Sequence, residues 1–175
     1  FINMYLRIIL SYFLSFFREI LLFESKGNSK AILFKDEKIK KFKSIKNVKE
    51  KLLIKHLKET KKIQRFNDNQ MFCVLYHKNK VTCFGWMHDH PHFYISEINK
   101  HIRIVNSNIL YDFFTIPKFR NKGFYSKLLR LIKNTKNKKK FEIYFLKNNI
   151  VSKNGILKAN FKLIKKINRY RDVRF

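Results

Sequence analysis

A basic loop with a single glycine has the residue types of an anion-binding site. It lies in "PKFRNKGFYSKLL", residues 117–129, where lysine and arginine surround Gly123. An apolar strand precedes the loop and an amphipathic helix follows it, so unpaired backbone N–H groups at the helix N-terminus would point the same way. Gly123 would let that backbone approach a phosphate closely, although it could also merely ease a turn. The loop lacks the spacing of a Walker loop or of a dinucleotide fingerprint.

Acid–base chemistry has several candidate residues near this loop. Asp112 lies in the strand before the loop, and Glu97 lies on a neighbouring predicted strand. Either carboxylate could act as a general base, directly or through a water molecule, or could simply pair with a lysine. Tyr125 and Tyr111 are candidate acids, and packing is the alternative role for both. The histidines of "HDHPH" (88–92) are further candidate bases.

The same histidine run raises the question of a metal site. Alternate histidines share one face of a strand, but Pro91 interrupts such a strand, and no carboxylate or cysteine ligand lies at a recognisable spacing. We therefore predict no metal, and assign His88 and His90 to substrate binding, with a plain surface loop as the alternative. Trp86 could stack on a substrate ring, with packing in the core as the alternative.

The elements that must position these residues are predicted in the second half of the chain. An aromatic-rich buried strand is expected over 108–116, ended by Pro117, and a helix over 122–135. A strand over 141–146, a helix over 149–159 and one or two final strands complete the order. The first half adds predicted strands at 18–25 and 31–35, a helix at 48–66, a hairpin over 71–88, and strands near 92–98 and 102–106. The prediction is a mixed α/β chain.

The first 23 residues are predicted to form an extra amphipathic helix, followed by one domain over 24–175. Polar residues recur there every three or four positions on an otherwise apolar segment. Arg7 leaves too short an apolar run for a membrane span. Packing against the domain or a partner subunit, as in a homodimer, and contact with a membrane surface are the remaining alternatives. The chain has no initiator methionine and could begin upstream of Phe1.

The net charge of +28 suggests an anionic partner, but nucleic acid is not the expected one. Only 9 of the 40 basic residues are arginine, the residue preferred for bidentate phosphate and base contacts. The lysines are spread along the whole chain, as expected for a solvated surface. Cys73 and Cys83 have no disulfide or metal spacing, so we expect buried thiols in a cytoplasmic protein.

Two segments resemble the GNAT superfamily of acetyl-CoA-dependent N-acetyltransferases. "ILYDFFTIPKFRNKGFYSKLLRLI" (109–132) is similar to its strand, R-x-x-G-x-G/A loop and helix, with Tyr125 in place of the last Gly or Ala. "NNIVSKNGILKANFKLI" (148–164) resembles N-x-x-[SA]-x-x-x-Y-x-K-x-G-F, with Ile156 in place of the Tyr and Asn160 in place of the Gly. The resemblance implies a mostly antiparallel, twisted central sheet flanked by helices.

The resemblance also implies roles for residues of both segments. In the family the loop binds the pyrophosphate of acetyl-CoA, the strand before it pairs with the pantetheine arm, and the Asn of the second motif bonds that arm. The implied acetyl-CoA-binding residues are Phe114, Thr115, Ile116, Arg120, Asn121, Lys122, Gly123, Phe124, Tyr125, Asn149 and Ser152. Ile156 excludes the family's usual tyrosine acid at that position.

The function that the resemblance implies is transfer of an acetyl group from acetyl-CoA to a primary amine of a small molecule. Gly85-Trp86 and residues 111–125 are similar to a subgroup associated with surface polysaccharides, which suggests a nucleotide-linked amino sugar as the acceptor. The alternatives are a GNAT-like module that binds without catalysis, suggested by Ile156 and Asn160, and a basic nucleic-acid-binding protein.

Overall fold

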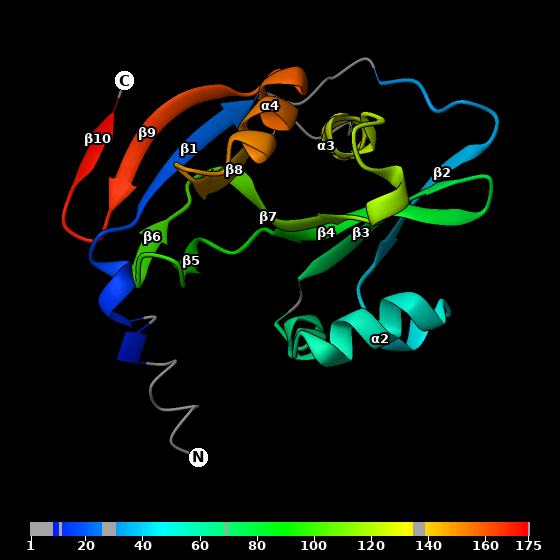
Figure 1. Cartoon of the computed structure of the whole chain (residues 1–175), viewed down its shortest axis with the longest axis horizontal. Coiled ribbons are helices and arrows are strands. Elements are labelled where there is room, and N and C mark those ends of the chain that lie inside the picture. Colours follow the sequence, from blue (N-terminus) through cyan, green and yellow to red (C-terminus); the bar gives the residue numbers. More distant parts are fainter. Residues whose placement is uncertain (1–8, 11, 26–30, 69, 135–138, 175) are drawn as a thin grey trace.

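The computed structural model describes residues 9–10, 12–25, 31–68, 70–134 and 139–174 (Figure 1). Within these ranges the chain alternates between strands, α-helices and short 3-10 helices (η). The elements are β1 (Glu19–Ser25), β2 (Glu37–Phe42), η1 (Ile45–Asn47), α2 (Lys51–Glu59), η2 (Ile63–Phe66), β3 (Met71–His77), β4 (Lys80–His88), β5 (His92–Ile95), β6 (Lys100–Arg103), β7 (Ser107–Thr115), η3 (Pro117–Phe119), α3 (Phe124–Lys133), β8 (Lys140–Leu146), α4 (Ile150–Lys158), β9 (Lys162–Asn168) and β10 (Asp172–Arg174).

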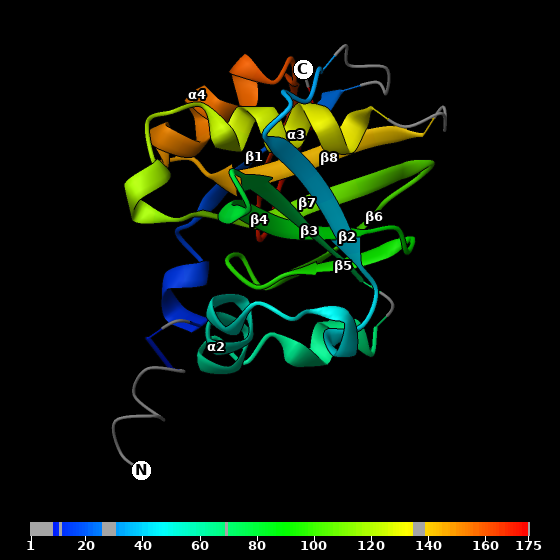
Figure 2. The ribbon, with the colours of Figure 1, turned by 90° about the vertical axis from the view of Figure 1, so that its right-hand side faces the viewer.

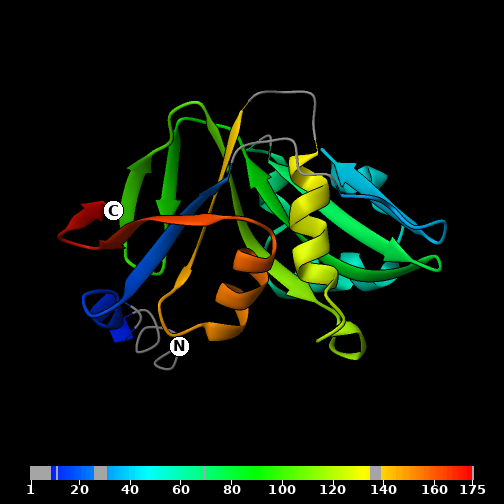
Figure 3. The ribbon, with the colours of Figure 1, turned by 90° about the horizontal axis from the view of Figure 1, so that it is seen from above.

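An eight-stranded sheet in the order β10-β9-β1-β8-β7-β4-β3-β2 forms the centre of the molecule. Its neighbouring strands are antiparallel, except that β7 and β8 pair in parallel. Strands β5 and β6 form a separate two-stranded ribbon. Helices α3 and α4 cover one face of the sheet and α2 lies on the other (Figure 2), and Figure 3 shows α3 and α4 side by side. The predicted fold class, a mostly antiparallel sheet flanked by helices, is confirmed.

Alternation of side chains along the strands creates two separate cores. In β1, Ile20 and Leu22 belong to the core under α2, whereas Leu21 and Phe23 belong to the core under α3 and α4. Side chains that alternate in this way point to opposite faces of a sheet. Cys73 and Cys83 are fully buried among these residues, and burial raises the pKa of each thiol to about 12.

The strand predicted over 18–25 is confirmed as β1 (Glu19–Ser25), so the overlapping prediction of a helix over 1–23 is wrong at its end. Strand β1 lies between β8 and β9, and a strand buried on both faces is as continuously apolar as a buried helix. A domain boundary after residue 23 would cut this strand, so β1 belongs to the domain. Residues 12–15 are helical, and residues 1–8 and 11 of the predicted helix lie outside the described residues.

The described part of this N-terminal segment contacts the domain on one side only. Arg169 donates a hydrogen bond to the Tyr12 hydroxyl, and its guanidinium lies over the ring of Phe16. Phe13 and Phe17 are 58% and 76% exposed. Contact with a partner subunit and contact with a membrane surface both stay predictions. Among the described residues, the helices are too short or too polar to cross a bilayer.

The helix predicted over 48–66 is divided into α2 and η2. Helix α2 ends at Glu59, and Lys61 adopts a left-handed conformation with a φ of 53°. This break turns the chain so that η2 brings Phe66 into the core against Trp86. The predicted strand at 31–35 is also wrong, since 31–34 lie outside any strand and β2 begins at Glu37. Ile32, Leu33 and Phe34 are exposed rather than paired, and the pairing with β3 starts only at Glu37 opposite His77.

Candidate active site

The candidate site is a cleft that opens where β7 and β8 separate. Their parallel pairing runs from Ser107 opposite Lys140 only as far as Leu110 opposite Ile143. Beyond this point β7 continues to Thr115 and β8 to Leu146 without pairing to each other. A cleft of about 940 Å³ lies between them, lined by residues of both strands, the loop after β7, and helices α3 and α4.

A β-bulge in β7 shapes the floor of this cleft. Phe84 of β4 pairs with Phe114 and Trp86 pairs with Tyr111, so Asp112 and Phe113 together lie opposite Gly85. Asp112 has a φ of 54°, a conformation that only a minority of non-glycine residues adopt. A Cβ atom on Gly85 would lie 2.3 Å from the Phe113 ring, so this glycine makes room for the bulged strand. The sequence analysis did not predict the bulge.

The predicted anion loop runs along one side of the cleft. After η3, the loop turns through Asn121 and Gly123, whose φ angles are 60° and 76°. Helix α3 begins at Phe124 without a side-chain cap, so its first N–H groups are available to a ligand. A Cβ atom on Gly123 would meet nothing within 4 Å, which leaves open space in front of the loop. This loop therefore combines a helix N-terminus, a left-handed glycine and basic side chains.

Most of the residues predicted to bind acetyl-CoA line this cleft. Those in its wall are Phe114, Thr115, Arg120, Asn121, Gly123, Phe124, Tyr125, Asn149 and Ser152. Ile116 and Lys122 do not line it. The backbone N–H of Ile116 donates to the Thr82 carbonyl, which anchors the end of β7. The Nε of Arg120 donates to the Thr115 carbonyl at 3.3 Å, so this arginine lies against the end of the strand.

The start of α4 forms the opposite side of the cleft. The Asn149 Oδ1 accepts a hydrogen bond from the Ser152 N–H at 3.0 Å and so caps the helix. The amide nitrogen of Asn149 is not used in this cap and can donate to a ligand. Ile156, which stands at the tyrosine position of the N-x-x-[SA]-x-x-x-Y pattern, is fully buried in the core.

Tyr125 reaches across from α3 towards α4. Its hydroxyl lies 3.3 Å from the Ser152 Oγ, and its ring packs against Phe113. A Cβ atom on Gly155 would lie 2.3 Å from the Tyr125 ring, so Gly155 makes room for it. Burial raises the pKa of the Tyr125 hydroxyl, which therefore stays protonated at neutral pH. The tyrosine that departs from the family pattern is thus part of the cleft wall.

Glu97 also lines the cleft, although it comes from the turn between β5 and β6. Its Oε2 accepts hydrogen bonds from the Ser96 hydroxyl at 3.1 Å and from the Tyr144 hydroxyl at 3.4 Å. Burial raises the pKa of Tyr144, and the negative charge of Glu97 raises it further. Tyr144 therefore stays protonated and donates to Glu97, and both of these hydrogen bonds use the same carboxylate oxygen.

Asp112 lines the cleft too, but two cations hold its carboxylate. Its Oδ2 lies 2.6 Å from the Lys62 Nζ and 2.5 Å from the Arg65 Nη1. Burial alone would raise the pKa of Asp112, but the hydrogen bond and charge of Lys62, together with Arg65, lower it below its ordinary value. A carboxylate held in this way is a weaker base, so the geometry favours Glu97 over Asp112 as the base.

The residues predicted to bind substrate lie outside this cleft. Trp86 is 1% exposed and packs against Phe66 and Phe72, which corresponds to the alternative of core packing. The Nε2 of His88 bonds the His92 carbonyl within the same loop, and His90 is exposed. No group of three or more metal-type side chains within the described ranges lies close enough to hold an ion.

Three residues in or beside the cleft, Tyr144, Lys62 and Arg65, were not among the predicted site residues. Tyr144 alternates with the buried residues of β8, so its position in "FEIYFL" could have placed it on the α2 side of the sheet. Lys62 and Arg65 had no such signal, because their position depends on the break after α2 and on the bulge at Asp112.

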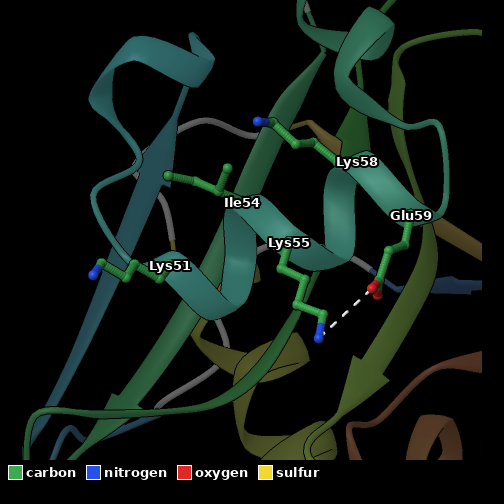
Figure 4. A pocket seen from close by; sticks show the side chains of 5 residues that line it. All are labelled: Lys51, Ile54, Lys55, Lys58 and Glu59. Carbon is green, nitrogen blue, oxygen red and sulfur yellow. Dashed lines mark ion pairs between the residues drawn. The ribbon is translucent and has the colours of Figure 1, made fainter.

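A second depression, of about 380 Å³, lies on the outward face of α2. It is lined by Lys51, Ile54, Lys55, Lys58 and Glu59, and Figure 4 shows these side chains spread along the helix. Lys55 and Glu59 form an exposed ion pair at 3.8 Å. None of these residues lines the cleft between β7 and β8, so this depression is a solvated helix surface.

Comparison with known proteins supports the fold. No protein-family profile and no curated protein sequence matches the chain. A functionally unknown conserved protein from Staphylococcus epidermidis superposes with a TM-score of 0.61 at 11% identity, over 85% of this chain and 59% of that one. A protein assigned to the GNAT family of acetyltransferases from Novosphingobium aromaticivorans gives 0.54 at 9% identity, over 85% and 61%.

A GCN5-related N-acetyltransferase from Sphaerobacter thermophilus gives a TM-score of 0.53 at 7% identity, over 85% of this chain and 49% of that one. The chain therefore spans about half to three fifths of the length of these solved structures. At such low identities the likeness extends to the fold, which is the GNAT fold.

Proposed function

We propose that the chain is an acetyl-CoA-dependent N-acetyltransferase that acts on a primary amine of a small molecule. The observation that carries this proposal is the cleft between β7 and β8, which combines an uncapped helix N-terminus with an unpaired strand edge. The helix N-terminus can bind a pyrophosphate through its free N–H groups. The unpaired strand edge can form hydrogen bonds with an amide-containing arm. The GNAT fold supports the same proposed function.

The residues of the cleft fit the two parts of acetyl-CoA. The N–H groups from Gly123 to Ser126, with Arg120 nearby, would hold the pyrophosphate. The free edge of β7 at Phe113 to Thr115 would pair with the pantetheine arm, and the amide nitrogen of Asn149 would donate to that arm. The thioester would then lie near the bulge, between the α3 side and the α2 side of the sheet.

The chemistry proposed is direct attack by the amine. Glu97 takes a proton from the ammonium group, and the neutral nitrogen attacks the thioester carbonyl carbon. A C–N bond forms, the C–S bond breaks, and backbone N–H groups of the bulge stabilise the oxyanion. The Tyr125 hydroxyl donates a hydrogen bond to the departing thiolate, in the role that Ile156 cannot take. The second proton of the amine leaves to solvent.

A nucleotide-linked amino sugar is the finer proposal for the acceptor. The similarity of residues 111–125 to the polysaccharide-associated subgroup supports it. Trp86 contributes nothing to it, because its ring is buried in the core.

The test uses two isosteric variants of the anion loop. Asparagine and aspartate both tolerate the left-handed conformation of Gly123, so Gly123→Asn and Gly123→Asp differ only in charge. We expect Gly123→Asp to lose acetyl-CoA binding in calorimetry, because the carboxylate would face the phosphates, while Gly123→Asn retains most of it. Equal affinities for the two variants would exclude this loop as the phosphate site. Release of free CoA thiol with a panel of amines then separates a catalyst from a module that only binds.

A further inference from the structure

A pair of cations lies beside the cleft on the α2 side of the sheet. Lys62 and Arg65 come from the segment after α2, and both contact the same oxygen of Asp112. One carboxylate therefore faces two positive charges, which leaves one positive charge without compensation within this cluster. Asp112 lines the cleft, whereas Lys62 and Arg65 lie outside its lining with side chains that are 21% and 25% exposed, so the cluster borders the cleft at Asp112.

Aromatic rings hold Arg65 in a fixed orientation. Its guanidinium carbon lies 4.9 Å from the centre of the Tyr111 ring and 5.5 Å from that of Trp86. Tyr111 is itself a residue of the cleft wall. A guanidinium has five N–H donors, and the bond to Asp112 uses one of them. Because stacking has already ordered the side chain, binding an anion would cost little further entropy.

A negative group lies at the other end of the same region. Glu97 lines the cleft and accepts a hydrogen bond from Tyr144. Asp112 and Tyr144 line the same cleft, so both carboxylates border one space. The region proposed to bind the acceptor thus has a negative charge at Glu97 and two positive charges at Lys62 and Arg65.

We propose that the acceptor is a primary amine that also bears an anionic group, a phosphate or a carboxylate. Its ammonium would lie at Glu97 and its anion at Arg65 and Lys62, where a guanidinium can bind two anion oxygens at once. This inference rests on the proposed acetyl transfer and names its substrate class. A polyamine would bring a second positive charge towards the two cations, so the site disfavours it.

The experiment compares matched pairs of amines by calorimetry on the full chain. The pairs are 2-aminoethyl phosphate with 2-aminoethanol, and glucosamine 6-phosphate with glucosamine. We expect the phosphate member of at least one pair to bind about tenfold more tightly or better, and Arg65→Gln to remove that difference. Arg65→Lys keeps the positive charge and the ion pair with Asp112 but loses the bidentate geometry of the guanidinium. We therefore expect it to retain part of the difference in affinity.

Lys58→Gln is the matched control, because it removes one positive charge from the outward face of α2 (Figure 4). It should leave the affinities for the phosphate-bearing amine and for its partner without phosphate unchanged. This result would distinguish recognition by Arg65 from general attraction by the net charge. Thermal unfolding of each variant checks that the fold is intact. Equal binding of both members of each pair, or a difference that survives Arg65→Gln in a folded protein, would overturn the inference.

Binding and turnover fail independently in this design. If the phosphate preference depends on Arg65 but no amine releases CoA thiol, the inference about the ligand stands and acetyl transfer is wrong. If neutral amines are acetylated as well as their phosphates and Arg65→Gln changes nothing, acetyl transfer stands and the anionic acceptor is wrong.

Discussion

Tyr125 occupies a position in the cleft that depends on two glycines. Gly155 leaves space for its ring on α4, while Gly85 leaves space for Phe113, which packs against the other side of that ring. The hydroxyl is directed to Ser152 at the wall of the cleft. Tyr125, which departs from the R-x-x-G-x-G/A loop pattern, thus brings a hydroxyl to the cleft wall. Ile156 is buried in the core and supplies no such group.

We expect Tyr125→Phe to lower kcat about tenfold or more while leaving the affinity for acetyl-CoA nearly unchanged. The variant keeps the ring between Phe113 and Gly155 and removes only the hydroxyl that would assist the thiolate. Initial rates of thiol release at saturating amine measure kcat, and calorimetry measures the affinity. Ser152→Ala is the control, since it removes the partner of the hydroxyl and not the hydroxyl. An unchanged kcat in Tyr125→Phe would exclude it as the acid.

At the scale of elements, the packing of α3 on α4 depends on the same contact. Helix α4 contains Gly155 in its interior, where glycine is about 1 kcal/mol less favourable than alanine. The ring of Tyr125 from α3 fills the space that a side chain at 155 would need. The contact between Tyr125 of α3 and Gly155 of α4 therefore offsets the lower helix propensity of glycine.

A double-mutant cycle measures this exchange. We expect Gly155→Ala alone to lower the free energy of unfolding by about 1–3 kcal/mol, because the new methyl group collides with the Tyr125 ring. In a Tyr125→Ala background the same change should raise it by about 1 kcal/mol, since only the helix propensity remains. Urea unfolding of the four proteins gives the coupling. Additive effects would contradict the contact.

Local patterns predicted the elements of the cleft but not their exact arrangement. The strand, loop and helix over 107–133 follow from an apolar run, a proline and one glycine that lie close together in the sequence. The bulge at Asp112 and the break after α2 have no comparable local signal, because tertiary contacts with Gly85 and Trp86 determine them. For the same reason Trp86 could not be placed in the core from its neighbours alone.

At the scale of the whole molecule, the net charge of +28 would attract the anionic ligand proposed for the cleft. A field of one sign raises the rate at which an oppositely charged ligand arrives and is screened by salt. This role does not require a nucleic-acid surface. In the proposed function the charge would contribute to the kinetics of acetyl-CoA binding, and the loop at Gly123 would contribute to its specificity.

We expect the association rate constant for acetyl-CoA to fall as ionic strength rises, with little change in the dissociation rate constant. Steering acts before the complex forms, whereas contacts inside the cleft control how long it lasts. Stopped-flow binding at several salt concentrations measures both constants. The rival nucleic-acid-binding protein would instead bind duplex DNA with a steep salt dependence, and that binding would survive Gly123→Asp.

The position of β1 has a consequence for biosynthesis. Strand β1 is the first strand among the described residues, yet its partners β8 and β9 follow on the order of a hundred residues later. At translation rates of about 5–20 residues per second, the backbone groups of β1 would have no strand partners for several seconds or longer, until β8 and β9 are synthesised. The nascent chain would therefore expose apolar strand edges throughout that interval, and the cleft can form only after β8 and α4 have been synthesised.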